Sequence, residues 1–290
     1  MNITAESVRQ LRERTGAGMM ECKRALVETG GDLDAAAEWL RKSGLAKADK
    51  KAARIAAEGT VAIERSGLDA ALVEVNCETD FVARSDEFQE FARAVASVAL
   101  AQNPASLEAL MAQQHGSPTL EERRRVLIAK IGENISVRRF ARVSAPGVLG
   151  TYLHGGRIGA LVALRGGDED LARDLAMHVA ATNPAYIDVA QVPAAVLEKE
   201  RSILAEQTRA EKKPAEIVAK MVEGRLRKYL AEITLLGQPF VKDPDVSVEK
   251  LLKKSAATVV QFARYEVGAG IEKKQDDFVG EVMAQVKAST

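Results

Sequence analysis

The first 45 residues carry apolar side chains at helical spacing in three short runs separated by glycines. Thr4 is placed to cap the first run and Asp32 to cap the third, and Gly44 is expected to stop the third. Helices this short bury little surface, so we predict that residues 1–45 form a docking head. Residues 46–57, rich in Lys and Ala, are expected to form an exposed helical linker.

A diverged duplication follows the head. Three segments recur in the same order, at 71–75 and 160–164, at 91–96 and 171–176, and at 137–142 and 259–264. The first and third are typical of strands and the second has helical spacing. Turn residues at Ser66-Gly67 and Gly155-Gly156 predict hairpins. The sequence therefore predicts an α+β fold with two related core subdomains, residues 58–145 and 146–270.

The spacing between the repeats locates an insertion in the second subdomain. The helix repeats lie 80 residues apart and the closing strands 122, which leaves about 42 additional residues in the second copy. Pro193 and Pro214 stand near the starts of two helix-patterned stretches. We therefore expect an antiparallel helical hairpin at about 187–230, projecting as an association surface. Residues 271–290 predict an amphipathic C-terminal helix, which packs on its own subdomain or contacts a partner.

Composition narrows the class of protein. The chain has 290 residues, 47% of them hydrophobic, with 41 basic and 41 acidic side chains. This balance is typical of a globular protein and does not favour direct binding of nucleic acid. No apolar run is long enough to span a membrane, and the first residues do not resemble a signal peptide. We expect a cytoplasmic protein in which Cys22 and Cys77 are reduced thiols.

The sequence contains no recognisable catalytic or metal-binding pattern. The three histidines, His115, His154 and His178, lack the spacing of metal ligands. No glycine-rich segment continues into a phosphate-binding loop, and no Ser or Cys occupies a nucleophile elbow. We therefore predict a binding protein without catalytic residues, metal or cofactor.

One segment departs from the usual pattern of a connection. Phe81 lies between the strand that ends near Cys77 and a helix that begins near Asp86, where polar turn residues are expected. A hydrophobic staple would need apolar residues on both sides of the helix cap, and this sequence lacks them. Phe81 therefore either folds back into the core of its subdomain, which these grounds alone favour, or forms a wedge with Asp80 beside it.

At this point the residues resemble a known family, elongation factor Ts. Residues 15–26 are similar to its N-terminal signature, and residues 74–83, which include Asp80 and Phe81, are similar to its second signature. Similarity continues at 154–159, 176–181, 238–243 and 262–273. The resemblance implies a ubiquitin-associated-like three-helix head, two duplicated core subdomains, a helical hairpin and a C-terminal helix.

The resemblance also implies an activity and a partner. It implies that the chain promotes exchange of GDP on the GTPase elongation factor Tu. By matching positions, Thr79, Asp80, Phe81 and Val82 enter the GTPase, where Phe81 wedges between helices and Asp80 disturbs the magnesium site. No direct nucleic acid or membrane contact is implied, and the hairpin allows a homodimer or a 2:2 complex.

Further partner contacts follow from the same resemblance. Those in the head are Arg12, Met19, Met20 and Lys23, which match positions that dock on the GTPase domain. His154 and Val241 match positions through which the second core subdomain reaches another domain of the partner. Two other readings stay open from the residues alone: an adaptor that binds small modifier proteins through its head, and an enzyme with a site assembled from distant residues.

Overall fold

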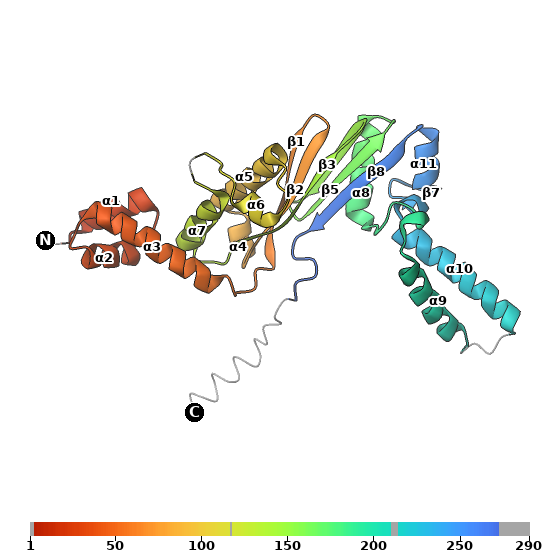
Figure 1. The fold of residues 1–290 in the computed structure, drawn as a ribbon, viewed down its shortest axis with the longest axis horizontal. Helices are drawn as coiled ribbons and strands as arrows, with labels where there is room; N and C mark the ends of the chain where they lie inside the picture. Colours follow the sequence, from red (N-terminus) through yellow and green to blue (C-terminus); the bar gives the residue numbers. More distant parts are fainter. Residues whose placement is uncertain (1–2, 117, 210–213, 273–290) are drawn as a thin grey trace, which may run out of the picture.

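The computed structural model describes residues 3–116, 118–209 and 214–272. A helical head, a central body of sheets and helices and a projecting helical hairpin follow one another along the long axis (Figure 1). The head contains α1 (Ala5–Thr15), α2 (Met19–Glu28) and α3 (Leu33–Lys51). Thr4 caps α1 in a capping box with Ser7, as its position predicted, and the Asp32 carboxylate accepts the first amides of α3. A small apolar core joins the three helices.

The prediction that Gly44 stops the third helix is wrong. α3 continues through Gly44 to Lys51 and takes in the first half of the expected linker. Gly44 instead lies against α7 (Leu120–Ile131), where an added Cβ would come within 3.0 Å of the Ala129 side chain. The glycine permits close packing of two helices. The end of the linker is not exposed either, because Ala56 and Ala57 are buried.

Two three-stranded antiparallel sheets form the centre of the molecule, and the α+β class is confirmed. One sheet has the order β1-β2-β3 and the other the order β4-β5-β8. Their strands are β1 (Glu58–Ser66), β2 (Asp69–Cys77), β3 (Ser136–Ser144), β4 (Val148–His154), β5 (Ile158–Arg165) and β8 (Thr258–Glu266). Each sheet is formed by a strand hairpin and a closing strand, with helical sequence between them, in the order that the sequence repeats predicted.

The repetition extends to small irregularities of the backbone. The first sheet has a register shift between Glu74 and Val75, and the second has one at the equivalent place, between Ala163 and Leu164. The long helix that follows each hairpin, 86–102 in the first half and 169–182 in the second, ends at an asparagine in the left-handed conformation, Asn103 or Asn183. The two halves therefore share local geometry as well as topology.

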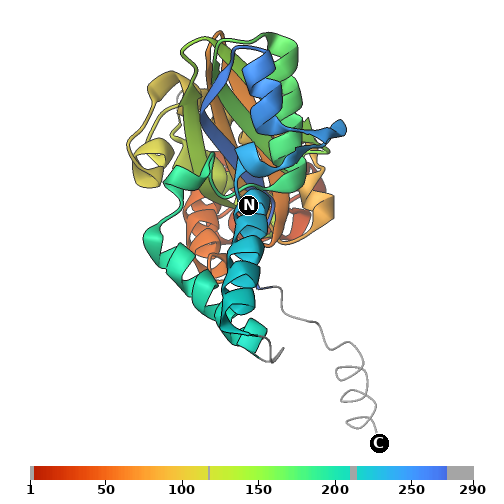
Figure 2. The ribbon, with the colours of Figure 1, turned by 90° about the vertical axis from the view of Figure 1, so that its right-hand side faces the viewer.

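The sheets pack face to face, with helices on their outer surfaces (Figures 1 and 2). Along β2, alternate residues face opposite ways: Leu72 joins the core between the sheets, and Val73 joins the core beneath the helices. The outer helices are α5 (Asp86–Gln102), α6 (Leu107–Met111) and α7 on the first sheet and α8 (Glu169–Thr182) on the second. Gly159 lets the sheets approach, because a Cβ there would lie 2.7 Å from the Leu72 side chain.

The insertion between α8 and β8 contains the predicted helical hairpin. Its helices are α9 (Ala194–Arg209) and α10 (Ala215–Ile233), which begin after Pro193 and Pro214 as expected. They run side by side away from the body (Figure 2) and hold a separate apolar cluster of Leu204, Val222 and Leu226. The insertion also contains η1 (Val189–Gln191), η2 (Leu235–Gly237), β6 (Pro239–Phe240), β7 (Asp243–Ser247) and α11 (Val248–Lys254).

A buried carboxylate joins the first sheet to the chain that leaves the second. Glu74 on β2 is fully buried, and its carboxylate accepts hydrogen bonds from the Gly268 amide (2.8 Å) and the Arg139 Nε (2.6 Å). The Arg138 guanidinium contacts the same carboxylate at 3.1 Å and also donates to the Ala269 carbonyl at 2.7 Å. These contacts dock residues 266–269 against the first half of the molecule.

Two remaining predictions concern the C-terminal helix and membrane-spanning segments. The predicted C-terminal helix at 271–290 falls almost entirely outside the described residues, which end at 272. None of the helices in the described ranges combines the length and apolar character needed to cross a membrane.

Candidate functional site

The loop after β2 forms a short helical turn that displays an aromatic ring. Thr79 caps α4 (Asp80–Ala83), and its hydroxyl accepts a hydrogen bond from the Val82 amide. The Phe81 side chain is 83% exposed, so the reading in which it folds back into the core is wrong. Val82, on the opposite side of the turn, packs against the core cluster of the first sheet. The turn therefore packs Val82 partly against the core and presents Phe81, the residue before it, to solvent.

A second segment of the chain, residues 133–134, forms hydrogen bonds with the start of this loop. Glu133, just after α7, accepts hydrogen bonds from the amides of Glu78 (3.1 Å) and Thr79 (3.0 Å) and from the Thr79 hydroxyl (2.7 Å). Glu78 returns the contact by accepting the Asn134 amide at 2.6 Å. Sequence reasoning did not find Glu133, because the partners lie more than 50 residues apart and no local pattern marks the pairing.

Asp80 stands at the edge of a groove between the two halves of the molecule. Its partly exposed carboxylate forms an ion pair with Arg84 at 3.0 Å. The groove has a volume of about 530 Å3 and runs between β1, α4 and the β4–β5 turn. Arg157 from that turn lines the groove and pairs with Glu58 of β1 at 2.7 Å. Asp80 therefore has an accessible carboxylate beside exposed cationic side chains rather than a buried one.

The thiols and the buried histidine near these elements do not form a catalytic arrangement. Both cysteines are free and buried, as the prediction of reduced thiols required. Burial, together with the Glu133 carboxylate, raises the pKa of Cys77 to about 12, so its nucleophilic thiolate is scarce at neutral pH. Burial lowers the pKa of His178, whose ring nitrogens contact Gln238 and the Val241 amide. Within the described residues, no cluster of His, Cys, Asp and Glu is suited to hold a metal ion.

The candidate residues of the head lie on its surface. Met19 is 45% and Met20 75% exposed at the start of α2, and Lys23 is exposed one turn later. Arg12 is exposed near the end of α1. Met20 and Lys23 lie three residues apart on α2 and therefore share a helix face. This exposed face belongs to the head and is separated from α4 by the length of α3 (Figure 1).

The structure places the two remaining candidates on different parts of the second half. His154 ends β4 and contacts the Tyr152 hydroxyl at 3.2 Å, in the turn that borders the Asp80 groove. Val241 is 43% exposed in the turn between β6 and β7, where its amide bonds to His178 of α8. The structure thus brings the turn that carries His154 near α4, while Val241 belongs to the insertion.

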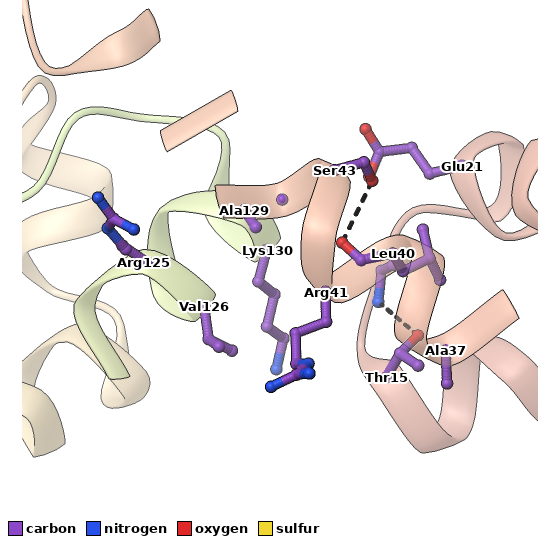
Figure 3. Close-up of a pocket in the computed structure, with 12 residues that line it drawn as sticks. Thr15, Glu21, Ala37, Leu40, Arg41, Ser43, Arg125, Val126, Ala129 and Lys130 are labelled. Atoms are coloured by element: carbon purple, nitrogen blue, oxygen red, sulfur yellow. Dashed lines mark hydrogen bonds between the residues drawn. The ribbon is translucent and has the colours of Figure 1, made fainter. Parts of the chain in front are cut away.

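A small pocket lies where the head meets the body. Figure 3 shows it between α3 and α7, with Arg41 and Lys130 along its rim and Val126 beside them. Its volume is about 150 Å3. The lining combines apolar side chains with cationic ones and the acidic Glu21. The pocket marks the junction of head and body.

The sequence of this chain is similar to those of known proteins over its whole length. The family model described as "Elongation factor TS" matches residues 78–269, which include α4, His154 and Val241. The chain is 59% identical to the elongation factor Ts of Thioalkalivibrio sulfidiphilus, and the similarity extends over the full length of both sequences. The chain belongs to the elongation factor Ts family. The proteins of the same name from Alkalilimnicola ehrlichii and Methylococcus capsulatus are 59% and 58% identical to it, again over the full length of both chains.

Family membership therefore covers the head as well as the body. The family model begins at residue 78, after the head, but the curated relatives extend through residues 1–77. The resemblance inferred from the two signatures is confirmed, and with it the assignment to translation elongation factors.

Proposed function

We propose that this chain is a guanine-nucleotide exchange factor for elongation factor Tu and acts through the loop Thr79–Val82. The observation that carries the proposal is the 83% exposure of Phe81 on a capped and braced turn. Burial of a large aromatic side chain in a partner is favourable by about 1.5–3 kcal/mol relative to leaving it in water. A ring on a rigid turn also loses little conformational entropy on insertion.

Asp80 supplies the electrostatic part of the proposed mechanism. Its carboxylate leads the turn and is partly exposed beside Phe81. Magnesium requires nearly ideal octahedral oxygen ligands and bridges the phosphates of a bound nucleotide, so a small displacement of its ligands weakens nucleotide binding. A ring that separates helices and an acid that competes for polar groups would produce such a displacement. No covalent step is required.

The rest of the molecule has a supporting role in this proposal. Residues 1–45 dock on the GTPase domain through Met19, Met20 and Lys23 of α2 and Arg12 of α1, and their exposure supports this. The subdomain 58–145 carries the loop, and the subdomain 146–270 reaches a second partner domain through His154 and Val241. We also propose that the hairpin joins two copies, directly or in a 2:2 complex, and that the factor works in the cytoplasm without direct contact with nucleic acid or membrane.

Exchange is reciprocal in this mechanism. If the factor weakens GDP binding by a given ratio, GDP weakens binding of the factor by the same ratio. Either one can therefore displace the other, and the factor leaves when nucleotide rebinds. This thermodynamic cycle explains how the factor can act repeatedly without a covalent step.

The test measures release of labelled GDP from elongation factor Tu in stopped flow. We expect the wild-type chain to accelerate release and Phe81→Ala to reduce the maximal rate by about tenfold, or ~1.4 kcal/mol of barrier. The matched control is Leu68→Ala, which removes a side chain of 44% exposure from the β1–β2 turn at the other end of β2. Equal rates for wild type and Phe81→Ala would refute the wedge, and no acceleration by wild type would refute the function.

A further inference from the structure

The exposed loop stands on a reciprocal clasp between residues 78–79 and 133–134. Glu133 accepts both amides at the entrance of α4 and the hydroxyl that caps it. In the other direction, Glu78 accepts the Asn134 amide. Each segment therefore satisfies backbone donors of the other, and three of these four bonds end on a single carboxylate. Hydrogen bonds to an ionised acceptor are about twice as strong as neutral ones.

The clasp is anchored to the end of the head's long helix. The Asn134 side chain donates to the carbonyls of Ala52 (3.4 Å) and Arg54 (2.7 Å), just past α3. The Arg54 guanidinium pairs with Glu78 at 2.6 Å. Lys51, the last residue of α3, donates to the Gly132 carbonyl at the end of α7. The base of the loop, the end of α7 and the end of α3 thus meet at one place.

We propose that Glu133 is a positioning residue that holds α4 in the orientation in which Phe81 stands out from the surface. The inference rests on the proposed exchange function, which it deepens by assigning a residue that does not itself enter the partner. α4 has only four residues and is too short to be stable alone. Its hydroxyl cap is shared, because the Thr79 oxygen that accepts the Val82 amide also donates to Glu133. Loss of the carboxylate removes the support of the cap as well as two backbone bonds.

A positioning role has a kinetic signature that general destabilisation lacks. Without Glu133 the loop samples other orientations, so Phe81 is rarely placed to enter the partner. We expect Glu133→Ala to lower the maximal rate of GDP release by about five- to tenfold, while the half-saturating factor concentration changes less than about twofold. Glu133→Gln keeps one acceptor oxygen for the two amides and should lose only about two- to threefold.

The control variant removes a similar glutamate cap at the other end of the neighbouring helix α7. Glu122, near the start of α7, accepts the Thr119 amide (2.9 Å) and hydroxyl (3.1 Å) in a capping box. Glu122→Ala therefore deletes one amide bond and one hydroxyl bond to a carboxylate, at the opposite end of α7 from Glu133. We expect its maximal exchange rate to equal that of wild type.

The deciding experiment combines Glu133→Ala with Phe81→Ala. If Glu133 acts by placing the ring, the double variant releases GDP about as slowly as Phe81→Ala alone, because the second change has nothing left to misplace. Losses that multiply would overturn the proposal, as would an unchanged rate in both Glu133 variants. If Glu133→Ala does not fold, the same cycle is run with Glu133→Gln.

A measurement on the free chain separates this inference from the exchange function. Hydrogen exchange of the Thr79 and Val82 amides should be faster in Glu133→Ala than in wild type and unchanged in Glu122→Ala. Unchanged protection would refute the clasp even if wild type accelerates GDP release. Faster exchange in a chain whose wild type does not accelerate release would leave the clasp intact and refute the exchange function alone.

Discussion

The buried carboxylate of Glu74 provides the sharpest test of what holds the two halves of this molecule together. In Glu74→Gln the oxygen that faces the Gly268 amide and Asn76 is retained. The other oxygen, 2.6 Å from the Arg139 Nε, becomes an amide that cannot accept that bond. The Arg139 bond is lost, worth about 1.5–3 kcal/mol, together with a longer bond from Arg138 to the same oxygen (3.4 Å), and the charge that faces two guanidinium groups is removed.

Exposure of the arginines limits the total loss. The Arg138 and Arg139 side chains are 29% and 35% exposed, so water replaces part of what the carboxylate supplied. Breaking a fully buried pair costs about 3–5 kcal/mol, and we therefore expect about 2–3 kcal/mol here. This loss lowers the melting temperature by roughly 3–5 °C in a protein of this size. Calorimetry or thermal circular dichroism measures it, with Glu90→Gln, which removes an exposed partner of Arg123, as control.

The pH dependence of the stability difference gives an independent check of the direction in which the Glu74 pKa is shifted. Burial alone would raise the pKa of Glu74, but the Gly268 amide and the Arg139 guanidinium hold it below the ordinary value of 4.5. A depressed folded pKa contributes stability that is present above the unfolded pKa and lost as the pH falls through the folded pKa. The difference between wild type and Glu74→Gln should stay constant from about pH 7 to about pH 5.5 and shrink below about pH 4.5. A melting temperature unchanged within about 1 °C, or a difference that grows in acid, would refute this account.

Two further predictions concern the thiols and the hairpin. Cys77 has a pKa of about 12 and no exposed surface, so it should not react with a thiol reagent at about pH 8 until denaturant unfolds the chain. Reaction in the native protein would contradict its burial. Replacing residues 199–225 with a short Gly/Ser loop should leave the body folded, because the hairpin cluster of Leu204, Val222 and Leu226 is separate. Light scattering should then show fewer chains per particle than in wild type, either for the chain alone or for its complex with elongation factor Tu. An unchanged number under both conditions would exclude a role of the hairpin in association.

The elements that could be predicted from sequence are those with a local or repeated signal. Thr4 and Asp32 mark helix starts because a side-chain oxygen next to the first amides is a short-range requirement. The repeats predicted both sheets because the central strands are buried on both faces, which leaves nearly continuous apolar runs. The prediction for Gly44 failed because glycine can end a helix or permit close packing, and only the packing of α3 on α7 shows which one applies.

The supports of the candidate site could not be predicted in this way. The Glu133 clasp joins segments 54 residues apart, and the contact between Glu74 and Gly268 spans 194. Charged residues of this kind occur throughout the chain, and neither sequence neighbourhood distinguishes them from solvated side chains. The exposure of Phe81 had the same difficulty, because an aromatic residue in a connection is usually buried and only the four-residue turn of α4 directs it outward.

One signal of the site was nevertheless present in the spacing of the repeats. The strand repeats lie 89 residues apart and the helix repeats 80, so the first half holds nine residues more than the second between hairpin and helix. In the second half, Gly166, Gly167 and Asp168 suffice to join β5 to α8. The connection between Cys77 and Asp86 has eight residues where the second half has three, so five of the nine additional residues lie in the segment that contains α4. The same comparison that located the helical hairpin therefore locates the loop, since both lie where one copy of a shared scaffold carries residues that the scaffold itself does not need.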